Sequence, residues 1–79
     1  MILPNKLITF SDSILAKIVF ILDELVVEDL KIDELYIRVK DKFDDINQYI
    51  VALDVLYTLE KINYNKKTQV VIYVKENTL

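Results

Sequence analysis

The stretch that most constrains the fold is 44–64, because its hydrophobic period changes part-way along. Asp45 is placed as an N-cap, and Gln48 three residues later completes a capping box. The apolar residues that follow recur three or four positions apart, as on one face of an α-helix: Ile46, Tyr49, Ile50, Leu53, Leu56, Tyr57 and Leu59. Further on, apolar and polar residues alternate, as in a β-strand. The sequence therefore predicts a helix over 45–60 that leads directly into a β-hairpin over 61–75.

The expected hairpin is apolar on both faces of its second strand. Val70 and Ile72 point one way, whereas Val71 and Tyr73 point the other. One face packs on the helices, and the other needs the N-terminal segment or a partner. The chain contains no glycine, so the turn relies on Asn65 or a neighbour to adopt a left-handed conformation.

Two further helices are expected upstream. A helix over 11–26, capped by Ser11, carries a core stripe made of Ile14, Leu15, Ile18, Ile21, Leu22 and Leu25. A helix over 32–43 has an inner face made of Leu35, Tyr36, Val39 and Phe43. The connector before it is expected to hold a short strand, with Leu30 and Ile32 facing the core. The polar residues Arg38, Lys40, Asp41 and Lys42 face solvent.

These elements predict one domain over 1–79, an α+β winged helix of three helices and a C-terminal hairpin wing. Residues 1–10 form an extended segment that is broken by Pro4. A short strand is expected within it, over 7–10.

The residue types that are missing exclude most active-site chemistry. The chain has no histidine and no cysteine, which removes catalytic triads, thiol nucleophiles and nearly all zinc sites. Without glycine there is neither a phosphate loop nor a dinucleotide-binding fingerprint. We therefore expect a protein that is not an enzyme and that holds no cofactor and no metal.

The apolar content points to a binding partner instead. Of the 79 residues, 53% are hydrophobic, and so small a domain cannot hide all of them inside. Some lie off the expected core stripes or near the free N-terminus, and these are the candidate partner-binding residues: Ile2, Leu3, Pro4, Val19, Phe20 and Val51. Phe20 is the expected hot spot, because aromatic anchors dominate interfaces.

A DNA-binding transcription regulator is the main alternative, since winged helices often place their third helix in the major groove. Here no lysine or arginine lies between Asp44 and Glu60, and Asp44, Asp45 and Asp54 would face phosphates. The wing residues Lys66 and Lys67 are weak candidates for backbone contacts. DNA is therefore expected to be bound only weakly or indirectly. The net charge of −3 agrees with this.

The sequence also bears on location. It has no run near the ~20 apolar residues that span a bilayer. The start, residues 1–4, lacks the basic region and the cleavage site of a signal peptide. We expect a cytoplasmic protein without membrane contact.

Two stretches resemble a known family. Leu3-Pro4-Asn5-Lys6 and the run over 52–62, ALDVLYTLEKI, are similar to the small middle components of prokaryotic three-component ABC-ATPase systems, most closely the type numbered six. The similarity covers nearly the whole chain. Glu60 stands where the family commonly has glycine, which argues against a tight left-handed helix end there and favours a turn nearer Asn63.

The resemblance implies a role as a subunit. Such systems are related to the Lamassu defences against phages and plasmids. They combine an SMC-like ABC ATPase, an effector such as a nuclease, and a middle protein that joins the two. The expected function is thus a non-enzymatic adaptor whose partners are the ATPase and the effector. A transcription regulator and a free-standing homodimer remain the alternatives.

Overall fold

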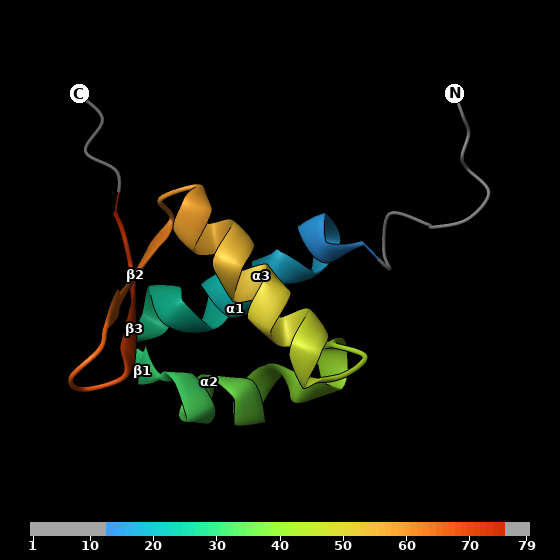
Figure 1. The fold of residues 1–79 in the computed structure, drawn as a ribbon, viewed down its shortest axis with the longest axis horizontal. Coiled ribbons are helices and arrows are strands. Elements are labelled where there is room, and N and C mark those ends of the chain that lie inside the picture. The colour runs from blue at the N-terminus through green and yellow to red at the C-terminus, as the bar shows by residue number, and fades with distance from the viewer. Residues whose placement is uncertain (1–12, 76–79) are drawn as a thin grey trace.

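Three helices and a small antiparallel sheet make up the computed structural model, which describes residues 13–75 (Figure 1). The sheet lies at one end of the helices. This is an α+β fold in a winged-helix-like arrangement, as the sequence predicted. In chain order the elements are α1 (Ile14–Val27), β1 (Leu30–Lys31), α2 (Ile32–Val39), the 3-10 helix η2 (Lys40–Lys42), α3 (Ile46–Thr58), β2 (Ile62–Asn65) and β3 (Val70–Tyr73). The extended segment and strand predicted within 1–10 lie outside the described residues.

The sheet joins the link between α1 and α2 to the C-terminal hairpin. Its strand order is β1-β3-β2, and all neighbours are antiparallel. Val71 in the central strand lies opposite Leu30 on one side and Tyr64 on the other. The N–H of Ile32 donates to the carbonyl of Gln69 over 2.9 Å, which extends the pairing to the start of α2. The short strand predicted before α2 is therefore confirmed, and it ties the wing to the helices.

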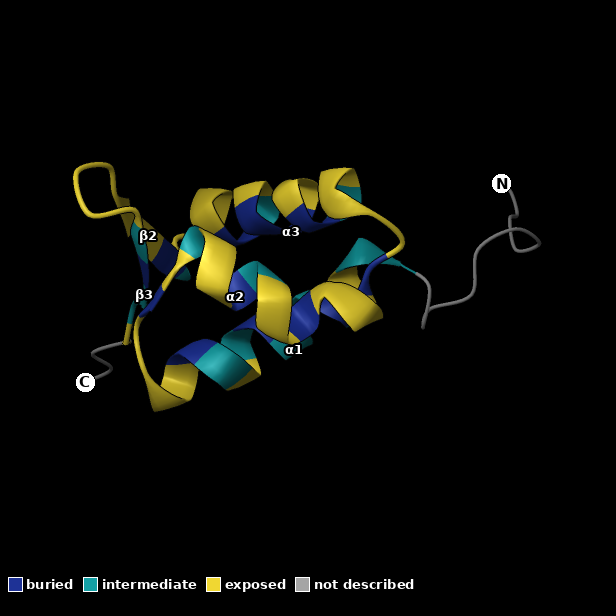
Figure 2. Ribbon diagram, turned by 90° about the horizontal axis from the view of Figure 1, so that it is seen from below, coloured by how far each residue is buried: buried dark blue, intermediate teal, exposed yellow. Residues whose placement is uncertain are grey.

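The core fills the space enclosed by the three helices and the sheet (Figure 2). Leu53 and Leu56 of α3 are buried, as predicted. Tyr49 forms an aromatic cluster, with ring centroids 4.8 Å from Tyr36 and 5.8 Å from Phe43. The buried apolar residues are Ile21, Leu25, Leu30, Leu35, Val39, Phe43, Tyr49, Ala52, Leu53, Leu56, Ile62 and Val71. The predicted inner face of α2 is thus confirmed by Leu35, Val39 and Phe43.

The start of α1 differs from the prediction. Its N-cap is Ser13, whose Oγ accepts a hydrogen bond from the N–H of Ala16 over 3.2 Å. The helix therefore begins at Ile14, not directly behind Ser11, which itself lies outside the described residues. Serine caps a helix wherever its side chain can reach a free N–H of the first turn, and the chain offers two serines close together.

The core-facing side of α1 also differs in one residue. Ile21 and Leu25 are buried as predicted, but Leu15 is 63% exposed. Lys17 is buried in its place, with only 7% of its surface exposed. The helix is rotated so that the side bearing Lys17 turns inwards and the side bearing Leu15 turns out. The burial of Lys17 could not be predicted from composition, because its hydrogen-bond partner lies on another helix.

The second helix is shorter than the predicted 32–43. The α-helix ends at Val39, and a 3-10 turn continues to Lys42. Val39 has φ −113° and ψ 0°, which departs from α-helical geometry. Phe43 is extended, and its N–H donates to the carbonyl of Lys40 over 3.2 Å. The tighter turn lets Phe43 enter the core against Tyr49.

The start of α3 follows the prediction in one half of the capping box. Asp45 is the N-cap, and its Oδ1 accepts from the N–H of Gln48 over 2.9 Å. The Gln48 side chain does not return to the cap residue. Its Oε1 accepts instead from the N–H of Asp44 over 2.8 Å, one residue earlier in the chain.

The end of α3 is a left-handed turn at Glu60, where φ is 62°. The N–H of Lys61 donates to the carbonyl of Leu56 over 2.9 Å, and the N–H of Glu60 donates to the carbonyl of Tyr57 over 3.0 Å. This pair of bonds is a Schellman motif, which usually has glycine at the left-handed position. The expected shift of the turn towards Asn63 was therefore wrong. The two bonds hold Glu60 in a conformation that costs a non-glycine residue about 1–2 kcal/mol.

The wing turn uses its asparagine differently from the prediction. The left-handed residue is Gln69, with φ 63°, and not Asn65. Asn65 instead accepts hydrogen bonds at Oδ1 from the N–H groups of Lys67 and Thr68, over 2.9 and 3.1 Å. Such a side-chain turn orders the backbone without a positive φ at the asparagine.

Candidate partner-binding surface

The candidate partner-binding residues lie in different surroundings. Val19 on α1 and Val51 on α3 are 46% and 48% exposed. Val51 lines a shallow hollow on α3 together with Val55 and Leu59, and Val19 is not among its lining residues. The remaining candidates at 2–4 lie outside the described residues.

Phe20, the expected hot spot, is half-buried. Its ring packs against the core, and Nζ of Lys42 lies 5.0 Å from the ring centroid. A lysine over an aromatic face is a cation–π contact. Phe20 therefore contributes to the stability of the fold, and it is not the freely exposed anchor that the sequence suggested.

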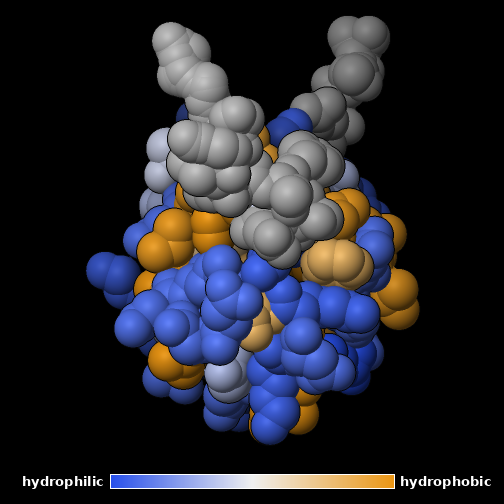
Figure 3. Space-filling model, turned by 90° about the vertical axis from the view of Figure 1, so that its right-hand side faces the viewer, coloured by the Kyte–Doolittle hydropathy of each residue, from blue (hydrophilic) through white to orange (hydrophobic). Residues whose placement is uncertain are grey.

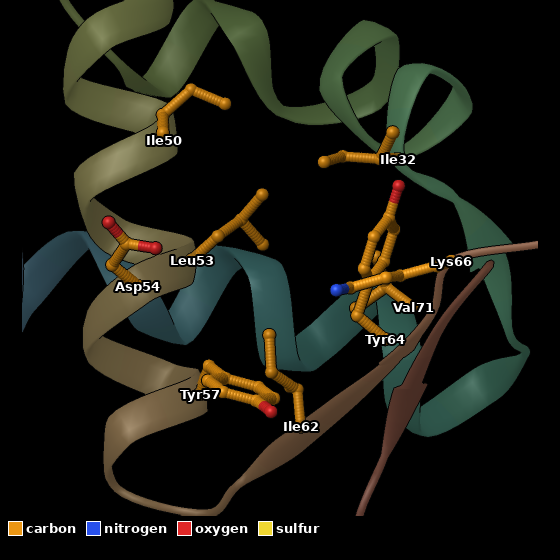
Figure 4. A pocket seen from close by; sticks show the side chains of 9 residues that line it. All are labelled: Ile32, Ile50, Leu53, Asp54, Tyr57, Ile62, Tyr64, Lys66 and Val71. Carbon is orange, nitrogen blue, oxygen red and sulfur yellow. The ribbon is translucent and has the colours of Figure 1, made fainter. Parts of the chain in front are cut away.

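One apolar hollow of the described residues was not predicted. It is a groove of about 440 Å³ between α3 and the wing, closed at one end by the start of α2 (Figure 4). Buried Leu53, Ile62 and Val71 contribute to its lining. The other lining residues are Ile32, Ile50, Asp54, Tyr57, Tyr64 and Lys66. They come from parts of the chain that are distant in sequence, so no local spacing could have revealed the groove.

The wall of the groove on α3 is formed by Ile50, Leu53, Asp54 and Tyr57. Three of these belong to a regular seam that begins one turn earlier, at Ile46, outside the lining. Ile46, Ile50, Leu53 and Tyr57 are spaced by four, three and four residues, so they follow one another along one face of the helix. Only Leu53 is buried, whereas Tyr57 is 57% exposed and Ile46 and Ile50 are exposed as well. The wide apolar stripe of this helix was the signal in the sequence. Half of it covers the core, and the other half faces solvent.

Two charged side chains stand at opposite walls of the groove. Asp54 projects from α3, and Lys66 reaches in from the turn of the wing (Figure 4). Both residues are exposed. No lysine or arginine lies within Ile46–Thr58, so α3 offers no cation to a phosphate backbone. The surface that a DNA-binding winged helix would present is therefore apolar and acidic here.

A comparison with known protein families identifies the family of this chain. Residues 3–71 match the model of "ABC-three component (ABC-3C) system Middle Component 7". The chain belongs to the Middle Component 7 family. The resemblance noted in the sequence was to the component numbered six, and the model that matches is the one numbered seven. As a component of a multi-component system, a member of this family has protein partners.

The Middle Component 7 match includes the whole of the groove. Its range runs from before α1 to Val71 in β3, so every lining residue falls inside it. Neither the comparison with curated proteins nor the comparison with solved structures gives a match.

A polar network lies at the opposite end of the helices from the sheet. Nζ of Lys17 donates to Oε1 of Gln48 over 3.0 Å and lies 3.5 Å from Oδ1 of Asp44. This end of the molecule, where the link between α2 and α3 runs, is largely hydrophilic (Figure 3). The network fixes α1 to the first turn of α3. Its ammonium group is buried between the two helices and hydrogen-bonded, so we assign it a structural role in this Middle Component 7 protein.

Two other polar groups also join elements. Arg38 contacts Glu24 and Glu28 of the α1 end, each over 3.2 Å, and the hydrogen bond to Glu24 is the main cause that raises the pKa of Arg38. The hydroxyl of Tyr49 donates to the carbonyl of Ile32 over 2.8 Å. Burial, with a smaller effect from Asp33, raises the pKa of Tyr49 above its ordinary value.

The described part of the chain contains no cluster of three or more acidic residues that could bind a metal ion. None of the helices within 13–75 has the length and apolar character needed to cross a membrane.

Proposed function

We propose that this protein is a non-enzymatic adaptor in its ABC-3C system, joining an SMC-like ABC ATPase to an effector subunit. The observation that carries the proposal is the exposed apolar surface, which occurs on two separate helices. Leu15, Val19 and Val26 are exposed on α1, and Ile46 and Tyr57 are exposed on α3. A protein that joins two others needs two such surfaces, and membership of a middle-component family supports the assignment.

The system itself is proposed to be a Lamassu-related defence against phages or plasmids that acts in the cytoplasm. This part rests on the family resemblance. It is tested by a plaque assay in cells that carry the complete system or the system without this gene. Equal plating on both strains would contradict the defence role.

Reconstitution tests the adaptor role directly. The ATPase and the effector from the same system are co-expressed with or without this protein, and complexes are separated by size-exclusion chromatography. We expect the two large subunits to elute together only when the adaptor is present. Co-elution in its absence, or an adaptor that binds neither subunit, would overturn the proposal. A free-standing homodimer would elute apart from both.

The transcription-regulator alternative is weakened by the third helix. The exposed surface of α3 carries Asp54 and apolar side chains but no lysine or arginine, and the wing turn carries the exposed Lys66 and Lys67. A shift assay with genomic fragments should show at most weak retention that disappears as salt increases. Sequence-selective binding at physiological salt would favour the regulator over the adaptor.

A further inference from the structure

The groove between α3 and the wing has the features of a site for one helix. Its α3 wall is part of a seam with the 4-3-4 spacing by which helices pack along one another, and Ile50, Leu53 and Tyr57 of that seam line the groove. From Ile46 to Tyr57 the seam runs for about 16 Å at 1.5 Å per residue, or three turns. An amphipathic helix that lies in such a groove presents its own apolar residues with the same spacing.

The charges at the walls restrict which helix fits. Asp54 follows Leu53 and is four residues from Ile50, so it lies at the edge of the seam. Lys66 lies at the facing wall, on the wing (Figure 4). A helix lying between them meets a carboxylate along one edge and an ammonium group along the other. A side chain of the bound helix favours binding when its charge is opposite to that of the groove residue beside it, and disfavours binding when the two charges are alike.

We propose that this groove binds one amphipathic α-helix of a partner protein, about three turns long, with a basic side chain against Asp54 and an acidic side chain against Lys66. The inference deepens the proposed function and rests on it, since it assigns one of the two adaptor surfaces to a partner of defined chemistry.

A second copy of this chain is a poor occupant. A two-fold pair would bring groove against groove, and two hollows do not fill each other. The exposed side of α1, with Leu15, Val19 and Val26, could enter the groove of another copy, because together with the half-buried Leu22 these residues also follow 4-3-4 spacing. However, the only base in Ile14–Val27 is Lys17, which is buried and hydrogen-bonded, so nothing on that helix can face Asp54.

The charge rule is tested with three synthetic helical peptides of about 20 residues, long enough to form a helix in water. All carry leucine at 4-3-4 spacing. One has lysine on one edge and glutamate on the other, one has lysine on both edges, and one has glutamate on both. Binding to the full chain is measured by fluorescence anisotropy. The wild type should prefer the mixed peptide by about two- to fivefold.

Two single substitutions should change this preference in opposite directions. Asp54→Lys makes both walls basic, so the all-glutamate peptide should bind best. Lys66→Glu makes both walls acidic, so the all-lysine peptide should bind best. An unchanged ranking in either variant, equal binding of the three peptides, or no binding at all would overturn the inference. Peptide-independent dimerisation that Tyr57→Asp abolishes would instead identify a second copy as the occupant.

A matched pair of variants tests the location. Tyr57→Asp in the groove should weaken binding of the mixed peptide at least tenfold. Ile37→Asp, at an exposed apolar position of α2 outside the groove, should leave it unchanged. Ile50→Asp provides a second groove variant should Tyr57→Asp unfold, as judged by circular dichroism. Equal losses in the groove variants and Ile37→Asp would contradict the assigned site.

Failure of this inference is distinguishable from failure of the proposed function. In the co-elution assay, a wild-type protein that binds neither large subunit contradicts the adaptor role. If the wild type binds both and Tyr57→Asp also binds both, the adaptor role holds and the groove is not a docking site.

Discussion

Lys17 of α1 donates a hydrogen bond to Gln48 of α3 over 3.0 Å, although almost all of the lysine is buried. Gln48 in turn accepts from the backbone N–H of Asp44. One amide side chain therefore satisfies a buried ammonium group and a free N–H of the link before α3. Lys17 and Gln48 are 31 positions apart in sequence, so this hydrogen bond joins α1 to α3.

Removal of the amide should destabilise the fold. Gln48→Ala leaves the Lys17 ammonium without its nearest partner, and we expect a loss of about 1–3 kcal/mol in the free energy of unfolding. Lys17→Met keeps the length of the side chain and removes the buried charge, so it should be close to neutral. Urea denaturation of both variants measures the difference. A Lys17→Met protein that is less stable than Gln48→Ala would contradict this role for the network.

The left-handed end of α3 predicts a stabilising substitution. Glu60→Gly removes the steric cost of a side chain at positive φ, although glycine also gives the unfolded chain more freedom. We expect the free energy of unfolding to increase by about 0.5–1 kcal/mol. Glu60→Ala is the control, because alanine has the same steric conflict and should bring no gain of this size. A glycine variant with an unchanged or lower denaturation midpoint would show that the turn is not strained.

Two leucines test the orientation of the helices. Leu53→Ala removes buried side-chain volume and should cost about 2–5 kcal/mol, enough to unfold a marginal domain. Leu15→Ala removes the same atoms from an exposed position, so its stability should stay within about 0.5 kcal/mol of the wild type. Thermal melting of both variants provides the comparison. Equal losses would mean that the rotation of α1 described above is wrong.

The exposed side of α1 is tested better at Val19 than at Phe20. Phe20 packs against the core and Lys42, so Phe20→Asp should lower stability as well as affect binding. Val19→Asp should leave the melting temperature within a few degrees and should weaken co-elution with one large subunit, if this side is the second adaptor surface. A fully bound Val19→Asp variant would remove α1 from the proposed interface.

Tyr49 should make the fold sensitive to alkaline pH. Its pKa is raised in the folded state, so the folded protein keeps the proton where the unfolded chain loses it, near the ordinary tyrosine pKa of about 10. The stabilisation from this proton is present below that pH and decreases as the pH rises above it. Urea midpoints between about pH 8 and 11 should fall less steeply for Tyr49→Phe than for the wild type. An equally steep fall of the urea midpoint in both proteins would contradict the role assigned to the Tyr49 proton.

Features that depend on neighbouring residues in sequence were predictable. The N-cap of α3 at Asp45, the switch from helix to hairpin and the buried face of α3 at Leu53 and Leu56 all follow from spacing or from hydrogen bonds within a few residues. The exposure of Val19 and Val51 followed from the same periodicity, and their part in binding stays a prediction. Winged-helix-like topology was predictable too, because few arrangements bury three amphipathic helices and a hairpin in so short a chain.

Only the tertiary structure decided which parts of an excess of apolar surface would be covered. Local spacing cannot fix the rotation of α1, because a partner on α3 decides that Lys17 and not Leu15 turns inwards. Nor can local spacing predict the groove, because its lining residues Ile32, Tyr57 and Tyr64 come from α2, α3 and the wing and lie together only in the tertiary structure. The sequence by itself determined the elements and their amphipathic faces through short-range periodicity and capping. Packing between elements then determined the buried charge and the open seam, because each depends on contacts that no local pattern contains.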